Sequence, residues 1–340
     1  MIPSERVLVI AEAGVNHNGS VDVAKKLVDA ALKAGADAVK FQTFVPEEVA
    51  AKSAEIAGYQ RANMPASRET QLEMIKRFTL SYEDFRCLKA YCDQTGIMFL
   101  STPFDKFSVD FLDDLGVPVF KVASGELVYH PFLRYVAAKG RPMILSTGMA
   151  TLGEIEEALA VVRAACRSVE ITLLHCTSDY PALFEDVNLK AIDTLRQAFG
   201  IPVGYSDHTP GIEVPVAAVA LGACIIEKHF TLDRNMEGPD HRASLEPEEL
   251  AAMIRAIRNV EKALGDGHKR PTSRELETMK VARRSLIAAC DITAGEIVSA
   301  DKLAIKRPGT GIPPKMLEIV VGRRARVDIP ADTVITWEMI

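Results

Sequence analysis

Eight short apolar runs, each followed by a segment with helical periodicity, fill most of residues 7–264. Each run is nearly continuous in apolar residues, as in strands of a parallel sheet that helices cover on its faces. This repeat predicts an α/β fold, with closure into a TIM (β/α)8 barrel as the best fit. A doubly wound open sheet is the alternative, but no Gly-x-Gly-x-x-Gly turn opens the chain, which favours the barrel. The expected strands lie within residues 7–14, 37–44, 97–104, 119–126, 142–149, 171–178, 202–208 and 223–230.

The segments between these runs carry helix-start signals and one long insertion. Thr151 and Glu154 form a capping-box pattern, and Pro247 stands where the first turn of another helix is expected. Residues 45–80 separate the second strand from its helix. Long loops on the catalytic side of a barrel usually shape the substrate pocket, so this insertion is a candidate lid.

The chain changes character after residue 264. We expect a barrel domain at 1–264, a polar linker with one helical segment at 265–282, and a small β-rich domain at 283–340. Residues 291–303 and 328–340 align without gaps, which indicates two similar halves in the small domain. A domain of this size has little core of its own, so we expect it to dock onto a partner surface.

Composition excludes several classes of protein. The net charge of −6, with both signs interspersed, argues against a nucleic-acid binder. With 48% apolar and 25% charged residues, the chain can bury a large core, yet it contains no run of 18 apolar residues and no signal-peptide pattern at its start. The 6 cysteines have no Cys-x-x-Cys spacing, so we expect reduced, mostly buried thiols and a cytoplasmic protein without membrane insertion.

Polar side chains gather where the expected strands end. In a TIM barrel the carboxyl ends of all strands surround one mouth, so residues far apart in sequence converge there. Lys40 and Lys121 stand within strand patterns, and a lysine is rarely buried without a partner or ligand. The strand-end set comprises Glu12, Lys40, Thr102, Lys121, Ser124, Glu126, Ser146, Ser178, Ser206, His208 and His229.

Two chemistries follow from this set. His208 and His229 end consecutive strands, so neutral imidazoles can bind a divalent metal, with Glu12, Glu126 and Asp240 as further ligands or supporting contacts. The lysines and serines form an anion site for phosphate or carboxylate. A metal beside an anion site suits addition of a phosphorylated carbon nucleophile to an aldehyde. A lysine Schiff-base aldolase also fits these residues.

Ten motifs in order resemble the sialic acid synthase family, which includes N-acetylneuraminate, legionaminate and pseudaminate synthases. The resemblance runs from about residue 6 to the C-terminus, and the set is far more specific than any one motif. The motifs are IAEAGVNHNG, VKFQTF, STPFD, FKVASGE, LSTGM, LHCTSDYP, GYSDHT, EKHFTLDR, GPDH and KRPGTGI.

The resemblance implies a TIM barrel followed by an antifreeze-like SAF domain of the β-clip type, in a homodimer whose small domain is swapped onto the partner's site. It implies condensation of phosphoenolpyruvate with an N-acylated aldehyde sugar, giving a nonulosonate and phosphate with a divalent metal, most often Mn²⁺ but also Mg²⁺ or Co²⁺. By motif, His208 and His229 correspond to the metal ligands. The phosphoenolpyruvate set is Lys40, Thr102, Lys121, Ser124, Ser146 and Ser206; the catalytic carboxylates are Glu12, Glu126 and Asp240; the sugar contacts are Ser178, Tyr180 and Arg307, the last from the partner subunit.

Two departures bear on which sugar is used. Ser178 replaces an asparagine of some N-acetylneuraminate synthases, and the segment GPDHRASLEP resembles the legionaminate branch. The family's generic assignment favours N-acetylneuraminate synthesis from N-acetylmannosamine. Legionaminate synthesis from 2,4-diacetamido-2,4,6-trideoxymannose is the alternative. Ice binding is disfavoured, because KRPG fits a cap on an active site better than a flat ice face.

Overall fold

The computed structural model describes residues 6–64 and 68–340. The chain divides into two compact units, Met1–Gly265 and Asp266–Ile340. Residues 65–67 of the predicted lid and residues 1–5 lie outside the described part. No helix in the described ranges is long and apolar enough to cross a membrane.

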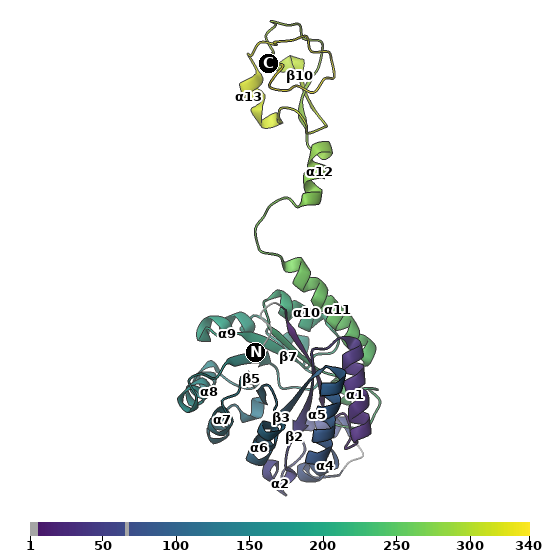
Figure 1. The fold of residues 1–340 in the computed structure, drawn as a ribbon, viewed down its shortest axis with the longest axis vertical. Helices are drawn as coiled ribbons and strands as arrows, with labels where there is room; N and C mark the ends of the chain where they lie inside the picture. The colour runs from purple at the N-terminus through teal and green to yellow at the C-terminus, as the bar shows by residue number, and fades with distance from the viewer. Residues whose placement is uncertain (1–5, 65–67) are drawn as a thin grey trace. The chain divides into compact units, whose positions relative to one another are not determined.

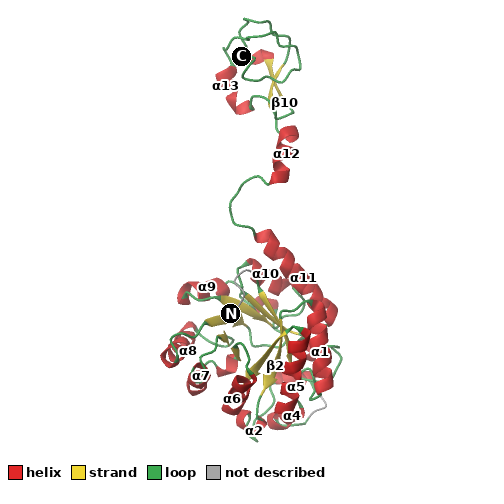
Figure 2. Ribbon diagram, viewed as in Figure 1, coloured by secondary structure: helices red, strands yellow, loops and turns green. Residues whose placement is uncertain are grey.

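The first unit is a ring of eight parallel strands surrounded by helices (Figures 1 and 2). Hydrogen bonds link the strands in the order β3-β2-β1-β8-β7-β6-β5-β4, and β3 and β4 lie within 8 Å of each other across the remaining gap. Because β1 pairs with both β2 and β8, the strands follow one another in cyclic order, which confirms the barrel and excludes the doubly wound sheet. The strands are β1 (Leu8–Gly14), β2 (Ala38–Thr43), β3 (Met98–Pro103), β4 (Phe120–Val122), β5 (Met143–Ser146), β6 (Ile171–Cys176), β7 (Val203–Asp207) and β8 (Ile225–His229).

Two helices of this unit, α8 (Leu152–Ala165) and α11 (Pro247–Leu264), begin at the helix-start signals predicted from the sequence. Thr151 caps its helix by accepting a hydrogen bond from the Glu154 backbone N–H, and Pro247 occupies the first turn of the last helix. The helices are α1 (Val21–Ala34), α2 (Pro46–Val49), α3 (Gly58–Asn63), α4 (Gln71–Arg77), α5 (Tyr82–Thr95), α6 (Lys106–Leu115), α7 (His130–Ala137), α8 (Leu152–Ala165), α9 (Ala191–Phe199), α10 (Glu213–Ala220) and α11 (Pro247–Leu264). Of these, α2, α3 and α4 belong to the 45–80 insertion.

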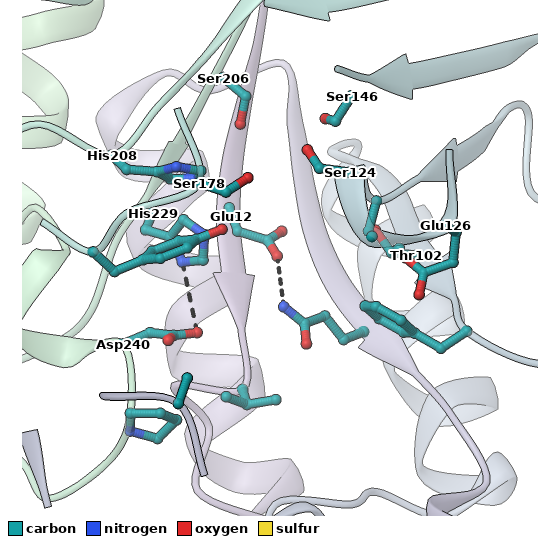
Figure 3. Close-up of a pocket in the computed structure, with 18 of the residues that line it drawn as sticks. Glu12, Thr102, Ser124, Glu126, Ser146, Ser178, Ser206, His208, His229 and Asp240 are labelled. Atoms are coloured by element: carbon teal, nitrogen blue, oxygen red, sulfur yellow. Dashed lines mark hydrogen bonds and ion pairs between the residues drawn. The ribbon is translucent and has the colours of Figure 1, made fainter. Parts of the chain in front are cut away.

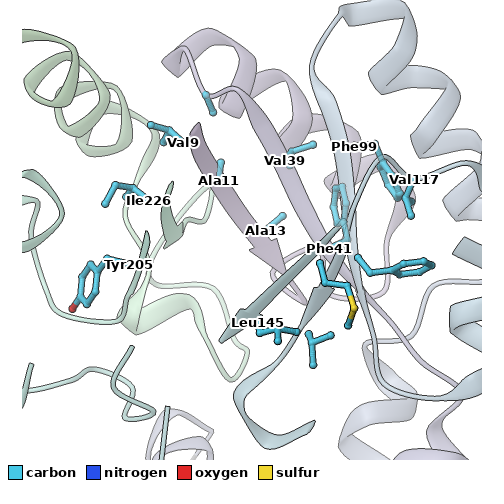
Figure 4. Close-up of a cluster of buried hydrophobic side chains, with 14 of the residues drawn as sticks. Val9, Ala11, Ala13, Val39, Phe41, Phe99, Val117, Leu145, Tyr205 and Ile226 are labelled. Carbon is cyan, nitrogen blue, oxygen red and sulfur yellow. The ribbon is translucent and has the colours of Figure 1, made fainter. Parts of the chain in front are cut away.

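The strands bury different residues on their two faces. Outward side chains pack against the helices in the main core, where Phe41, Phe99 and Tyr205 are among the largest members (Figure 4). Inward side chains fill the barrel with a separate apolar plug, and Gly204 leaves room in it, since a Cβ there would lie 2.6 Å from the backbone oxygen of Ile225. The plug consists of Leu8, Ile10, Ala38, Leu100, Val119, Ile144, Leu174 and Ile225. It gives the cavity above it an apolar base.

The second unit contains α12 (Ser273–Ala282), the antiparallel strands β9 (Ser285–Ala288) and β10 (Leu303–Lys306), and α13 (Leu317–Val320). The predicted duplication is visible in its hydrogen bonds. Ile292 and Ile329 exchange backbone N–H···O bonds, each donating to the other. The Asp291 carboxylate accepts from the Ala331 N–H, and the Asp328 carboxylate accepts from the Ala294 N–H at the same 2.7 Å distance. The two halves therefore support each other through matching contacts.

The six cysteines are free, as expected for reduced thiols. The prediction that most of them are buried is wrong: Cys92 and Cys176 are buried, whereas Cys87 and Cys290 are exposed and the other two are half-buried. Cys87 is exposed because helical periodicity places it on the outer side of α5, away from the buried Leu88 and Cys92.

Candidate active site

A cavity of about 670 Å³ opens at the carboxyl ends of the strands. All the predicted site residues of the barrel line it, although they come from all eight strands and the loops that follow them (Figure 3). His208, His229 and Asp240 lie on one side, and Thr102, Ser124 and Glu126 lie on the other. The lining set contains Glu12, Lys40, Thr102, Lys121, Ser124, Glu126, Ser146, Ser178, Tyr180, Ser206, His208, His229 and Asp240.

The floor of the cavity is the next inward layer above the apolar plug. Side chains alternate between the two faces of a strand, so a residue two positions after a plug residue also points into the barrel. Lys40 follows Ala38 in this way, and Lys121 follows Val119. The same spacing brings Glu12, Thr102, Ser146, Cys176 and Glu227 into this layer. The polar floor therefore results from continuing the strand alternation by one step.

Two lysines and two carboxylates form the charged centre of this floor. Lys40 Nζ lies 2.9 Å from Glu12 Oε2 and 3.6 Å from Glu227 Oε2. Lys121 Nζ lies 3.5 Å from Glu227 Oε1. Lys40 also donates to Thr102 Oγ1 at 2.9 Å. All four charged groups are buried, so an anion arriving here meets two ammonium groups in a medium that screens them little.

Glu227 was missed in the sequence analysis. Burial opposes its ionisation, but Lys121 and Lys40 lower the pKa of the Glu227 carboxyl to about 2, and Ser206 donates to it at 2.9 Å. The predicted site residues were sought where a polar residue ends a strand, whereas Glu227 stands two positions before the end of β8. The alternation in IIEKH could have found it, because Glu227 and His229 must share the inward face.

Hydroxyl groups and a glycine form the wall beside Lys121. Ser124 Oγ accepts a hydrogen bond from the backbone N–H of Gly148 at 3.0 Å. A Cβ at Gly148 would lie 2.2 Å from Ser178 Oγ and 2.8 Å from Ser124 Oγ, so no larger residue fits without displacing both. Ser146 and Ser206 complete this donor-rich side. Small residues let hydroxyl and backbone donors approach one ligand together.

The two imidazoles form a pair, with ring centroids 5.4 Å apart. Burial lowers the pKa of both His208 and His229, so both rings are neutral near pH 7. His208 Nδ1 lies 2.6 Å from the carbonyl oxygen of Thr177, which can only accept, so Nδ1 donates and Nε2 keeps a lone pair. His229 Nδ1 is buried with no hydrogen-bond partner. The centroid of the Tyr180 ring lies 4.0 Å from the centroid of the His208 ring.

This pair could hold a divalent metal. A ring nitrogen with a free lone pair, fixed by a hydrogen bond at the other nitrogen, is the usual form of a metal-binding histidine, and His208 has this form. Within the described ranges, no group of three or more His, Cys, Asp or Glu side chains is arranged to hold a metal. Two protein ligands would leave further coordination positions to water and substrate, and a catalytic metal needs at least one such open position.

Three carboxyl groups around the cavity have raised pKa values. Burial raises the pKa of Glu126 to about 7 and that of Asp240 to about 6. Burial also raises the pKa of Glu12 to about 7, against the opposing effect of Lys40. Asp240 Oδ2 lies 3.9 Å from His229 Nδ1, and Glu12 accepts a hydrogen bond from Gln42 at 3.3 Å. Such groups can exchange protons with a substrate near neutral pH.

Two family patterns match the chain, the NeuB family over residues 27–269 and the SAF domain over residues 283–340. The chain belongs to the NeuB family. This confirms the resemblance to sialic acid synthases and the presence of an SAF domain after the barrel.

Characterised relatives of this NeuB-family chain differ in the product that their names give. It is 48% identical to the N,N'-diacetyllegionaminic acid synthases of Legionella pneumophila and Campylobacter jejuni, over 98% and 97% of its length and 94% and 99% of theirs. It is 37% identical to the human N-acetylneuraminate-9-phosphate synthase, over 98% of its length and 92% of that protein. It is also similar to the crystal structure of a sialic acid synthetase from Leptospira borgpetersenii, with TM-score 0.72, 36% identity, and coverage of 81% of this chain and 90% of that one.

Arg307 is the one predicted site residue that does not line the cavity. It belongs to the SAF domain of this NeuB-family protein, where its Nε donates to the backbone oxygen of Ala282 at 3.0 Å. Its role at the site of a partner subunit remains a prediction.

A buried ion pair between Lys228 and Asp207 supports the two histidines from outside the barrel. Lys228 alternates with Glu227 and His229, so it faces the helices, where its Nζ lies 2.5 Å from Asp207 Oδ2 and also donates to the Thr209 carbonyl. Asp207 Oδ1 accepts from the Thr209 hydroxyl at 2.9 Å. Both charges are fully buried, and they hold the backbone on either side of His208. Neither residue of this pair was predicted from the sequence.

We expect Lys228→Met to lower the free energy of unfolding by about 3–5 kcal/mol, because it leaves the Asp207 carboxylate buried without its counter-charge. Urea unfolding of the full chain measures this change. Lys89→Met breaks an ion pair on the surface of α5, 2.6 Å from Asp93, and is the control, with an expected loss of at most about 1 kcal/mol. Equal losses for both variants would contradict the assigned importance of the buried pair.

Proposed function

We propose that this protein is a nonulosonate synthase that condenses phosphoenolpyruvate with an N-acylated aldehyde sugar. The products are a nine-carbon 2-keto acid and inorganic phosphate. The observation that carries the proposal is the layered cavity, in which two buried lysines and several hydroxyls lie directly below a pair of neutral imidazoles and beside carboxyls with raised pKa values. Membership in the NeuB family supports it independently.

Phosphoenolpyruvate is assigned to the floor. Its phosphate and carboxylate would accept hydrogen bonds from Lys40 and Lys121 and from the surrounding hydroxyls of Thr102, Ser124, Ser146 and Ser206. Glu227 neutralises part of the lysine charge before the substrate arrives.

A divalent metal is assigned to His208 and His229, with Mn²⁺ as first choice and Mg²⁺ or Co²⁺ as alternatives. The orphaned Nδ1 of His229 and the fixed tautomer of His208 fit such an ion. When bound, the ion would polarise the aldehyde oxygen of the sugar as a Lewis acid.

The carbon–carbon bond forms between C3 of phosphoenolpyruvate and the aldehyde carbon. The aldehyde oxygen then needs a proton, and Glu126, protonated in part at pH 7, is placed on the cavity wall to supply it. Water adds to C2, and phosphate leaves by cleavage of the C–O bond. Glu12 belongs to the floor layer and, with its pKa raised to about 7, can accept the proton from this water, while Asp240 is assigned to the sugar side.

Of the two sugars that the sequence leaves open, we propose 2,4-diacetamido-2,4,6-trideoxymannose, which gives a legionaminate-type product. The two relatives named for that product are 48% identical, against 37% for the human enzyme named for a 9-phosphate. N-acetylmannosamine remains the second candidate.

Phosphate release from phosphoenolpyruvate tests the function. We expect release only with an amino sugar and a divalent metal together, and a higher kcat/KM with the diacetamido sugar than with N-acetylmannosamine. Release without any sugar would contradict the synthase function. Capture of a substrate imine on Lys40 or Lys121 by borohydride would contradict the synthase mechanism and favour an aldolase.

We also propose a cytoplasmic homodimer in which the SAF domain of each chain caps the partner's barrel and brings Arg307 to the sugar. The free cysteines support the location. Large apolar side chains in the segments that follow β3, β4 and β6 support a covering partner, since Phe107 in the first turn of α6, Val128 and Phe184 are all more than half exposed.

A further inference from the structure

The cavity has two parts of opposite polarity. Its floor carries the charged groups and hydroxyls, whereas its outer side is formed by apolar residues of the 45–80 insertion and its neighbours. We call this second part the apolar wall, and it consists of Val15, Phe44, Val49, Ala57, Met74, Ile75, Phe78 and Phe104. A ligand that fills the cavity must match both parts.

The apolar wall is a packed structure. Met74 and Phe78 are each 4% exposed, and they belong to a hydrophobic cluster separate from the main barrel core. The rings of Phe44 and Phe104 lie 6.1 Å apart in an edge-on arrangement. Thr70 and Glu73 form a capping box that starts α4, the helix that carries Met74. The wall is therefore built before a ligand arrives.

Strand β2 and the residue that follows it, Phe44, give the order of the parts from floor to mouth. Lys40, Gln42 and Phe44 all line the cavity at alternating positions, so each lies one step further out than the last. An anion at Lys40 thus places the reacting carbon near the level of Gln42 and the distal end of the sugar at the apolar wall. Two amides, Gln60 and Gln71, line the cavity beside the wall and can bond polar atoms of that distal end.

We propose that the apolar wall binds the methyl-bearing groups at the distal end of the sugar, namely the C6 methyl and the C4 acetamido group of 2,4-diacetamido-2,4,6-trideoxymannose. This inference rests on the proposed function and names the part of the cavity that selects the sugar. An acetamido group needs an apolar surface for its methyl and an amide partner for its polar atoms, and the wall with Gln60 and Gln71 offers both. The hydroxyls at C4 and C6 of N-acetylmannosamine would lose their hydrating water at this wall without full replacement of its hydrogen bonds, which weakens binding. They would also leave part of the apolar surface without a contact.

Met74→Gln tests this inference, because glutamine has nearly the same shape as methionine but brings a polar amide to the wall. We expect kcat/KM for the diacetamido sugar, divided by that for N-acetylmannosamine, to fall about tenfold, near the lower end of what one apolar contact contributes to discrimination. The KM for phosphoenolpyruvate should not change, since the floor is untouched.

Met64→Gln is the matched control. Met64 belongs to the same hydrophobic cluster and is 1% exposed, but it does not line the cavity. An unchanged ratio in Met74→Gln, or an equal fall in Met64→Gln, overturns the inference. Thermal unfolding of both variants shows that each is folded under assay conditions.

Failure of the proposed function has a different signature. If the wild-type protein with metal releases no phosphate with either sugar, the synthase assignment fails, and calorimetric titration with the diacetamido sugar then tests the wall directly. Weaker binding in Met74→Gln but not in Met64→Gln supports the wall as its subsite. No measurable binding to the wild-type protein, or equal weakening in both variants, overturns it.

Discussion

Replacing both His208 and His229 by alanine is expected to lower the rate of phosphate release by about a thousandfold or more, since loss of metal polarisation removes several kcal/mol of stabilisation from the transition state. The two rings are neutral, adjacent and aimed into the cavity, and no third His, Cys, Asp or Glu in the described ranges completes a cluster that could replace them. Steady-state kinetics with added Mn²⁺ measures the loss.

Binding of phosphoenolpyruvate to the floor of the cavity is the control for this prediction. Binding of phosphoenolpyruvate, measured by calorimetry in the absence of metal, should change little in the double variant, because Lys40 and Lys121 are intact. His268→Ala, at an exposed position near the start of the second unit, should retain full activity. Undiminished turnover in the His208→Ala/His229→Ala protein would rule out the metal mechanism.

The same variants can test the proposed exchange of SAF domains. A His229→Ala chain has an intact Arg307, and an Arg307→Ala chain has an intact His229. If each site combines the barrel of one chain with the SAF domain of its partner, mixing two inactive proteins should restore activity in sites that are free of both changes. No recovery after demonstrated subunit exchange would contradict the swapped arrangement.

Glu126→Gln is expected to lower kcat by about a hundredfold to a thousandfold, within the range for loss of a positioned general acid. The amide keeps the shape of the side chain but cannot deliver a proton. The pKa of Glu126 is raised to about 7 by burial, so below pH 7 the carboxyl is mostly protonated and can donate. Above pH 7 the proton is lost, and kcat of the wild-type enzyme should fall. A pH profile of kcat should show this alkaline decline in the wild type only.

Glu185→Gln, a change at an exposed position outside the cavity, serves as the comparison and should keep both the rate and the pH profile of the wild type. An alkaline decline that persists unchanged in Glu126→Gln would assign the proton to another group, of which Glu12 is the nearest in pKa.

The barrel and most of its site could be predicted because both depend on strand ends. Apolar runs show where each strand lies, and the polar residue that ends a run must lie at the mouth of the barrel. Glu227 and Lys228 escaped this reasoning because they stand inside an apolar run, where only the strict alternation of faces decides that one enters the cavity and the other packs under the helices. Their partners, Lys121 and Asp207, come from other strands, so the pairing depends on the tertiary structure.

The insertion shows a different limit. Its position and its contribution to the cavity were predicted from its length and place in the chain, but its three short helices were not. Segments such as α2, with four residues and none of them buried, are too short to be stable alone, and α2 forms against the neighbouring α4, which carries Met74 of the hydrophobic cluster. Local sequence patterns carry little of that information.

The separation of the floor from the apolar wall also bears on how such an enzyme can evolve. The floor rests on the barrel plug and shares its strands, so nearly any change there risks both phosphate chemistry and stability. The wall has its own hydrophobic cluster, formed by the inserted segment together with Val15, Phe44 and Phe104, so it can accumulate substitutions while the chemistry below continues. New sugars can therefore be recruited by a lineage through changes in the loops that form this wall, with the condensation step inherited intact.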